Sequence, residues 1–235
     1  ETIPIWSLPT HAAIPPLMKH CLRLSSLVVC LAVFAGCAKP SRSLHKLPPT
    51  HTSALRYKPA FSKVLYRCIV DGRFIFKKYH LSGLLFFKTL ENGTVRAIYQ
   101  NEMGFTFFDF EWDANDSFKI NKLIPQLNKQ AVVKVLRKDM QLFLMKGLDA
   151  EKEILYTGRG KEELHCYTIG EGDACYVVED EKLVRIENRG KRKKVTTINI
   201  IGKSMPDAMP QKARFVHHKA NFTIELEKLV SDVNE

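Results

Sequence analysis

Short apolar segments separated by turn-forming residues recur along the chain from about residue 61 onward. The segments "KVLYRCIV" and "RFIFKKYHLSGLLFFKTL" end at Asp71-Gly72 and Asn92-Gly93, and "TVRAIYQ" and "FTFFDFEW" follow. Asp-Gly and Asn-Gly favour tight hairpins, because both central residues of a type I′ turn need a positive φ angle. We therefore expect this region to be an antiparallel meander.

The stretch "LNKQAVVKVLRKDMQLFL", residues 127–144, breaks the strand pattern. Its apolar residues recur three or four positions apart, which is the spacing of an amphipathic helix. Asn128 is a suitable N-cap and Gly147 a suitable stop. Because only one face of this helix is apolar, we expect it to cover a sheet.

Strand signals then resume and continue to the end of the chain, from "EILYTG" through "NFTIELEKL". The pattern predicts about eleven to twelve strands and one main helix, a mainly β fold. So many antiparallel strands in one domain favour a barrel, or a sheet that curls far enough to approach one. We expect an open, incomplete antiparallel β-barrel over residues 61–230, covered by the helix at about 127–144.

Aromatic residues are concentrated in the first half of this domain. Nine of the fourteen phenylalanines lie between Phe74 and Phe118, and "FTFFDFEW" carries apolar residues on both faces of a strand. Either one face forms the core while the other packs on the helix, or one face lines an apolar cavity for an acyl chain. The candidate cavity residues are Phe74, Phe76, Phe86, Phe105, Phe107, Phe108, Phe110 and Trp112.

The N-terminal region has the order of features of an export signal. Residues 24–38 carry no charge, but a helix needs about 20 apolar residues to cross a membrane, so this run is too short. A basic segment, an apolar run and small residues follow one another within residues 18–36, as in a secretory signal peptide. Residues 1–17 contain four prolines and are expected to have no function. An ordinary signal peptide with a chance cysteine is the alternative to the interpretation below.

The residues Phe34-Ala35-Gly36-Cys37 resemble the lipobox of bacterial lipoproteins. The resemblance implies cleavage before Cys37 and attachment of lipid to it. Residues 37–60 are rich in proline, serine and threonine and read as a tether between this anchor and the domain. Acidic residues that resemble inner-membrane retention or surface-export signals are lacking after Cys37, which by elimination suggests the periplasmic face of the outer membrane.

Charge and cysteines add two further expectations. The net charge of +11 suits an anionic membrane surface, and the exported chain makes nucleic acid an improbable partner. Five basic residues at a predicted hairpin tip are candidate membrane contacts, unless they are only a solvated turn: Arg189, Lys191, Arg192, Lys193 and Lys194. Cys166 and Cys175 flank a glycine-rich turn and can either form a disulfide or remain buried thiols.

The order "LSGLLFFKTLENGTVRAIYQNEMGFTFFDFEW", then "FKINKLIP", then the helix resembles lipid-anchored members of the LolA/LolB-like (lipoprotein carrier-like) superfamily. The resemblance implies an incomplete barrel whose concave apolar face is covered by helices and can hold acyl chains. It is recognisable over residues 79–144 and extends as architecture over 61–230. It identifies no short catalytic motif.

These observations predict an envelope protein that binds lipid or lipoprotein acyl chains in an apolar half-barrel and takes part in lipoprotein or lipid trafficking. The alternative is a lipid-anchored structural or interaction module with a filled barrel and no ligand. No phosphate-binding loop, GxSxG, HExxH or CxxC occurs, so we expect no enzymatic activity, cofactor or metal. We expect a monomer.

Overall fold

The computed structural model describes residues 45–47, 53–74, 77–158, 160–170, 172–190, 193–203 and 205–230. Every described residue belongs to one compact unit, Leu44–Glu235. The predicted segments 1–17 and 18–36, and Cys37 with most of the tether, therefore lie outside the described residues.

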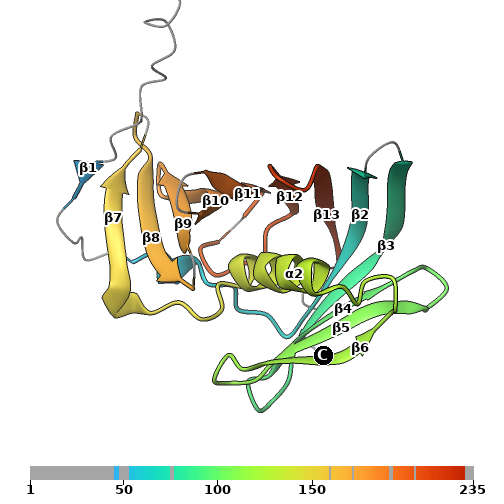
Figure 1. Cartoon of the computed structure of the whole chain (residues 1–235). Helices are drawn as coiled ribbons and strands as arrows, with labels where there is room; N and C mark the ends of the chain where they lie inside the picture. The colour runs from blue at the N-terminus through green and yellow to red at the C-terminus, as the bar shows by residue number, and fades with distance from the viewer. Residues whose placement is uncertain are drawn as a thin grey trace, which may run out of the picture. The chain divides into compact units, whose positions relative to one another are not determined.

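Antiparallel strands form one strongly curved sheet (Figure 1). The strands are β1 (His45–Lys46), β2 (Lys63–Phe74), β3 (Lys77–Thr89), β4 (Val95–Gln100), β5 (Thr106–Trp112), β6 (Phe118–Leu123), β7 (Glu153–Thr157), β8 (Glu163–Ile169), β9 (Gly172–Glu179), β10 (Lys182–Gly190), β11 (Lys194–Ile201), β12 (Lys212–His217) and β13 (Phe222–Val230). Their order in the sheet is β1-β7-β8-β9-β10-β11-β12-β13-β2-β3-β4-β5-β6.

The ends of this strand order do not meet. β1 and β6 are the terminal strands and do not pair with one another within the described residues, so the barrel is open. The predicted open antiparallel barrel is thereby confirmed. The sheet has 13 strands, more than the eleven to twelve expected. One strand that the sequence did not reveal is the two-residue β1, which pairs with β7 and lies inside the predicted tether.

The predicted turn at Asp71-Gly72 is wrong. Both residues lie inside β2, where they pair with His80 and Tyr79 of β3 and also with β13. A Cβ atom placed on Gly72 would lie 2.9 Å from the Cβ of Phe222. Glycine is needed at this point because two strands approach closely, not because the chain reverses. The turn at Asn92-Gly93 is present, and Gly93 has a φ angle of 79°.

Helix α2 (Gln130–Phe143) lies on the concave side of the sheet (Figure 1). The other helical segments are single 3₁₀ turns, η1 (Ala54–Tyr57) and η2 (Ala150–Lys152). The predicted helix is confirmed, but it starts three residues late, because Asn128 donates to Ile124 within a preceding turn and Lys129 takes the N-cap position. No helix in the described part of the chain is long and apolar enough to cross a membrane.

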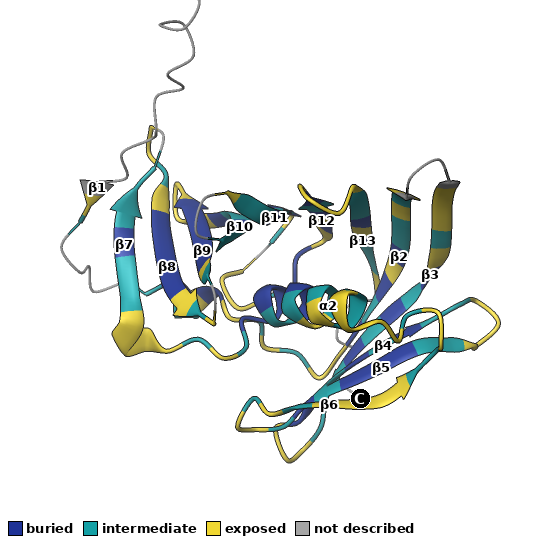
Figure 2. Ribbon diagram, viewed as in Figure 1, coloured by how far each residue is buried: buried dark blue, intermediate teal, exposed yellow. Residues whose placement is uncertain are grey.

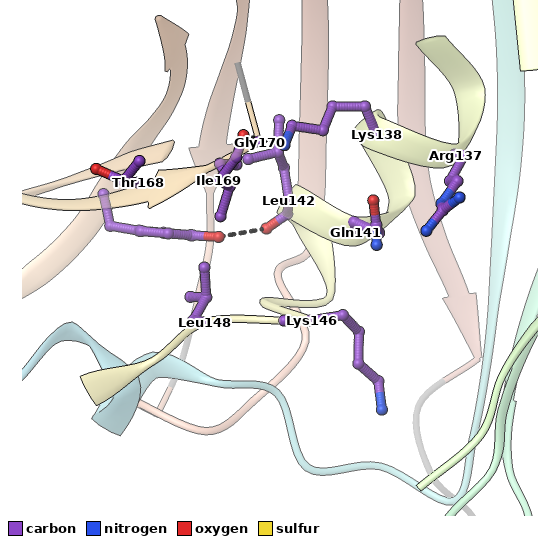
Figure 3. A pocket seen from close by; sticks show the side chains of 11 residues that line it. Arg137, Lys138, Gln141, Leu142, Lys146, Leu148, Thr168, Ile169 and Gly170 are labelled. Atoms are coloured by element: carbon purple, nitrogen blue, oxygen red, sulfur yellow. Dashed lines mark hydrogen bonds between the residues drawn. The ribbon is translucent and has the colours of Figure 1, made fainter. Parts of the chain in front are cut away.

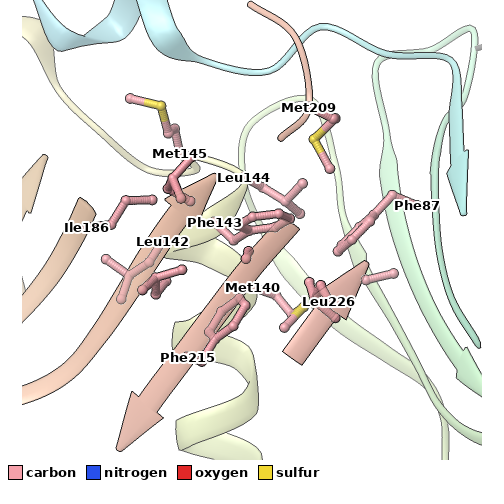
Figure 4. Packing of buried hydrophobic residues seen from close by; sticks show 14 of the residues in the cluster. Phe87, Met140, Leu142, Phe143, Leu144, Met145, Ile186, Met209, Phe215 and Leu226 are labelled. Carbon is pink, nitrogen blue, oxygen red and sulfur yellow. The ribbon is translucent and has the colours of Figure 1, made fainter. Parts of the chain in front are cut away.

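The hydrophobic core lies between α2 and the concave face of the sheet (Figure 2). The apolar stripe of α2 contributes Met140, Leu142 and Phe143. Phe143 is surrounded by sheet residues, with ring-centroid distances of 5.8 Å to Phe87 and 5.6 Å to Phe215 (Figure 4). The last helical turn is thus the part of α2 that is fully buried.

Candidate functional site

The concave face of the sheet is the predicted acyl site, and in the structure α2 fills it. Tyr66 and Phe87 approach Phe143 from β2 and β3, and Leu226 contributes from β13 (Figure 4). The phenol groups under the helix are satisfied, since the hydroxyl of Tyr66 donates to the carbonyl of Pro210 at 2.6 Å. The lining contributed by these residues is therefore apolar with the Tyr66 hydroxyl paired, as suits a hydrocarbon-binding surface.

The predicted cavity residues do not form one surface. Phe108, Phe110 and Trp112 point into the core and are buried, and Phe108 stacks on Phe110 at 4.4 Å. The other described residues of the set lie outside that buried group: Phe86 and Phe107 are half-buried, and Phe105 is 54% exposed. The side chains of Phe74 and Phe76 are outside the described residues.

The space around Phe143 at the end of α2 is small. A cavity bounded by Tyr57, Phe143, Ile186 and Ile200 has a volume of about 10 Å³. That is about the volume that one water molecule needs. An acyl chain can occupy the concave face only if α2 moves away from it.

A buried acid and base tie α2 to the sheet. The carboxylate of Asp139 on α2 lies 2.7 Å from Nε2 of His217 on β12, and both side chains are almost fully buried. The ring of His217 stacks on Phe222 at 3.7 Å. The second carboxylate oxygen, Oδ1 of Asp139, is buried without a hydrogen-bond partner among the described residues.

The hydrogen bonds of this pair fix the number of its protons. Nδ1 of His217 lies 3.1 Å from the carbonyl oxygen of Phe222, which can only accept, so Nδ1 carries a hydrogen. The bond between Asp139 and Nε2 then needs one more proton, held by either group. Burial raises the pKa of Asp139, although the hydrogen bond and charge of His217 oppose the rise. No local sequence pattern predicts this contact, because 78 residues separate the partners.

A second depression, which we call the cationic pocket, lies where the last turns of α2 face the β8–β9 hairpin (Figure 3). Its volume is about 370 Å³, within the range of small-molecule sites. Apolar Leu142, Leu148 and Ile169 form part of its wall. Its polar lining includes Arg137, Lys138, Gln141, Lys146, Thr168 and Tyr176. Sequence reasoning missed this site, because the hairpin is distant in sequence from the helix.

The predicted basic tip lies between β10 and β11, as expected, but its charges are not equivalent. Arg189 and Lys194 both contact the carboxylate of Glu187, which is completely buried, and Arg189 does so at 2.7 Å. Lys193 is exposed. Lys191 and Arg192 lie outside the described residues.

The carboxylate of Glu187 is the centre of a compact ion-pair network. Arg185 also donates to it, at 2.8 Å, and pairs with Glu162. Burial alone would raise the pKa of Glu187, but the hydrogen bonds from Lys194 and Arg189 and their charges lower it to about 2. Two of the five predicted membrane contacts thus neutralise an internal carboxylate.

Cys166 and Cys175 occupy directly opposite positions on β8 and β9 and are joined by a disulfide. Cys68 is a free, buried cysteine. His165, the neighbour of Cys166, hydrogen-bonds Glu153 at 2.6 Å. In the part of the chain that the structure describes, no group of three or more His, Cys, Asp or Glu residues is placed to hold a metal ion.

No protein-family model and no curated protein matches this sequence. Three solved structures are similar in fold. They are a putative outer membrane lipoprotein-sorting protein domain from Vibrio parahaemolyticus (TM-score 0.46, 7% identity, 77% of this chain and 89% of that chain), a LolA superfamily protein from Nitrosomonas europaea (0.44, 6%, 77% and 91%) and a DUF1329 family protein from Desulfovibrio piger (0.42, 10%, 77% and 91%). Likeness at this level assigns no function to the chain.

Proposed function

We propose that this domain binds lipid or lipoprotein acyl chains of the cell envelope, and that α2 occupies the acyl site until a chain displaces it. One observation carries the proposal: α2 is the only α-helix among the described residues, and it packs its apolar face on the concave side of the sheet. A role in lipoprotein or lipid trafficking to the outer membrane would follow from such binding.

Burial of the end of α2 and burial of an acyl chain on the same surface contribute similar free energies. Five consecutive or nearly consecutive side chains at the end of α2 are buried: Met140, Leu142, Phe143, Leu144 and Met145. Their burial is worth roughly 10 kcal/mol at about 2 kcal/mol each. A chain of about 14 methylenes gains about 11 kcal/mol on the same surface. An acyl chain can therefore replace the helix without a large net cost.

The start of α2 is weakly held. Its N-cap is Lys129, which makes no side-chain hydrogen bond to the helix, and the first turn contains no acidic residue. A capping side chain and an acidic residue each stabilise a helix N-terminus by up to about 1 kcal/mol, and α2 lacks both. The first two turns are at most half-buried. A helix anchored at one end only is suited to opening.

The location of the protein belongs to the proposal as well. A lipid on Cys37 would hold the domain at the periplasmic face of the outer membrane, and the disulfide between Cys166 and Cys175 is typical of oxidising compartments such as the periplasm. Incorporation of labelled palmitate into the full chain, and its loss in Cys37→Ser, would be the expected result. Undiminished labelling of the variant would contradict the anchor.

Competition between helix and lipid gives a sharp test of acyl binding. Leu136 is half-buried and packs on the core from α2, so Leu136→Ala should weaken helix docking by roughly 1 to 2 kcal/mol. If docking and binding compete, delipidated Leu136→Ala should bind a fluorescent fatty acid about 5 to 30 times more tightly than the native chain. Leu229→Ala, a substitution at an exposed position of β13, is the matched control.

The same experiment addresses the second candidate function, an envelope interaction module with a filled barrel. The observation that favours it is the internal cavity of only about 10 Å³. This module predicts that neither the native chain nor folded Leu136→Ala binds the fatty acid, and that no acyl lipid co-purifies by mass spectrometry. That pair of results would overturn the acyl-binding proposal.

A further inference from the structure

The cationic pocket carries positive charge without a carboxylate in its lining. Arg137, Lys138 and Lys146 contribute to it from α2 and the segment that follows (Figure 3). Two acids outside the lining bond residues within it: Asp116 pairs with Lys146 at 3.0 Å, and Asp173 accepts the hydroxyl of Thr168 at 3.1 Å. The three cations of the lining thus outnumber the two carboxylates that bond its residues, which leaves the pocket positive.

Two of these cations have no acidic partner. The ammonium of Lys138 donates to the carbonyl of Ile169 at 3.3 Å, and the guanidinium of Arg137 lies over the ring of Phe118 at 4.5 Å. Among the described residues neither forms an ion pair. A carbonyl and an aromatic face are weak substitutes for an anion, so both groups keep unused charge and donor capacity.

The arrangement is electrostatically unfavourable when the pocket holds no anion. Burial, together with the charges of Arg137 and Lys134, lowers the pKa of Lys138 to about 8. An anion placed among these groups would favour the charged form of Lys138 and offset the repulsion between the cations. Surface lysines usually avoid such a cost by extending into water.

We infer that the cationic pocket binds a phosphate-type oxyanion, either as free phosphate or as the headgroup of an anionic lipid. Arg137 supplies a planar fork suited to two oxygens, and Lys138 supplies a compact charge. The amide of Gln141 can donate a further hydrogen bond. Leu142 connects the pocket wall to the core beneath α2, so a lipid could place its phosphate here and its chain on the concave face.

The two possible ligands relate differently to the proposed function. Binding of a lipid headgroup rests on the proposed acyl binding, because the attached chain must enter the acyl site. Binding of free phosphate does not. The experiment therefore titrates the full chain with three probes by calorimetry: inorganic phosphate, dioctanoyl phosphatidic acid and neutral dioctanoylglycerol.

The variant Arg137→Gln/Lys138→Gln removes two charges from the pocket and retains hydrogen-bonding side chains. Its matched control, Lys119→Gln/Lys182→Gln, removes two exposed charges from β6 and β10, outside the pocket. We expect the pocket variant to bind the phosphate-bearing probe at least about tenfold more weakly, as for the loss of charge-assisted hydrogen bonds. The control should remain within about twofold of the native chain, and added salt should weaken native binding.

The outcomes separate the two sources and the two proposals. Charge-dependent binding of inorganic phosphate supports a free-anion site, and charge-dependent binding of phosphatidic acid alone supports a headgroup site. The inference is overturned if neither phosphate probe binds, if the control loses as much as the pocket variant, or if dioctanoylglycerol binds as tightly as phosphatidic acid. In that last case acyl binding survives without the oxyanion site. Phosphate binding without dioctanoylglycerol binding leaves the oxyanion site standing and counts against the acyl site.

Discussion

Individual residues decide how firmly the helix is held to the sheet, and Asp139 is the clearest case. Its carboxyl group is buried, shares one proton with His217 and has one unpaired oxygen. Buried acids of this kind are expensive to ionise, and the rise in the pKa of Asp139 expresses that cost. The contact therefore makes α2 docking sensitive to pH.

The direction of this sensitivity follows from linkage. The folded protein holds the Asp139 proton to a higher pH than the unfolded chain, whose carboxyl has its ordinary pKa of 3.8. The resulting stability is present below that value and is lost as pH rises through the raised pKa of the folded state. Asp139→Asn keeps a donor for Nε2 of His217 but no longer titrates.

We expect Asp139→Asn to reduce the fall in the free energy of unfolding between acidic and alkaline pH. Urea denaturation at a series of pH values measures it, with Asp180→Asn as a control at an exposed carboxylate. If the free energy of unfolding depends on pH in the same way in the native chain and in Asp139→Asn, the Asp139–His217 pair does not titrate between acidic and alkaline pH.

Glu187 gives the opposite pH dependence. Its pKa is lowered from 4.5 to about 2, so its contribution is present above 4.5 and is lost as pH falls through the lower value. At neutral pH the shift corresponds to about 3 kcal/mol. Glu187→Gln should lower the free energy of unfolding by about that amount at pH 7 and by much less near pH 2.

The measurement for Glu187 is again urea denaturation, with exposed Glu225→Gln as the matched control. Glu225 pairs with Arg214 on the sheet surface, where a salt bridge is worth about 1 kcal/mol or less. A loss in Glu187→Gln no larger than in this control would mean that the three cations around Glu187 find other partners.

At the scale of elements, α2 stands out because its two ends differ. The C-terminal turn is buried, and the N-terminus lacks both a cap and acidic residues. Lys129 adopts extended backbone angles, φ −115° and ψ 128°, that are suited to a capping side chain. A substitution there can strengthen the helix without touching the core.

Lys129→Asp should stabilise α2 by about 1 kcal/mol through capping and the helix dipole. If the helix competes with acyl chains, affinity for a fluorescent fatty acid should fall about fivefold. The change is opposite in sign to that of Leu136→Ala, so a general effect of mutation cannot explain both. Lys182→Asp, which adds the same charge change at the start of β10, should leave affinity unaltered. A more stable helix with unchanged fatty-acid affinity would separate α2 from the site.

Elements were predictable where the signal was local. The apolar residues of "FTFFDFEW" identified β5 but not which of its faces is buried, and the 3.6-residue period identified α2. Asp71-Gly72 misled, because a glycine required by a close strand contact has the same sequence signature as a turn. The α2 start was placed too early because Asn128, a good capping residue, is used in a turn.

The candidate sites were less predictable, because long-range contacts create them. Asp139 meets His217 across 78 positions, and the cationic pocket needs both α2 and the β8–β9 hairpin. Sequence patterns report which face of an element is apolar, but not which two elements meet. Whether the barrel is filled depends on how deep the helix sits, and no local pattern encodes that depth.

For the whole molecule, the net charge of +11 predicts attraction to anionic membranes, and the structure divides the charges that can act. Lys193 and Lys194 are neighbours at one hairpin tip. Lys194 neutralises buried Glu187, whereas Lys193 is exposed. Only an exposed charge such as Lys193 can turn toward headgroups without breaking an internal ion pair and lowering the free energy of unfolding.

Charge reversal at these neighbours should therefore have different consequences. Lys193→Glu changes the charge by two units, each worth about 1 kcal/mol at an anionic surface, so binding to phosphatidylglycerol vesicles at low salt should weaken by roughly 30-fold. Lys194→Glu should in addition lower the free energy of unfolding, because it places a second carboxylate against Glu187. Vesicle sedimentation at low and high salt, paired with urea denaturation, measures both effects.

High salt should remove most of the difference between Lys193→Glu and the native chain, since exposed charges are screened over about 10 Å. Equal vesicle binding by the two proteins at low salt would exclude the tip as a membrane contact and shift that role to other basic surfaces of the domain.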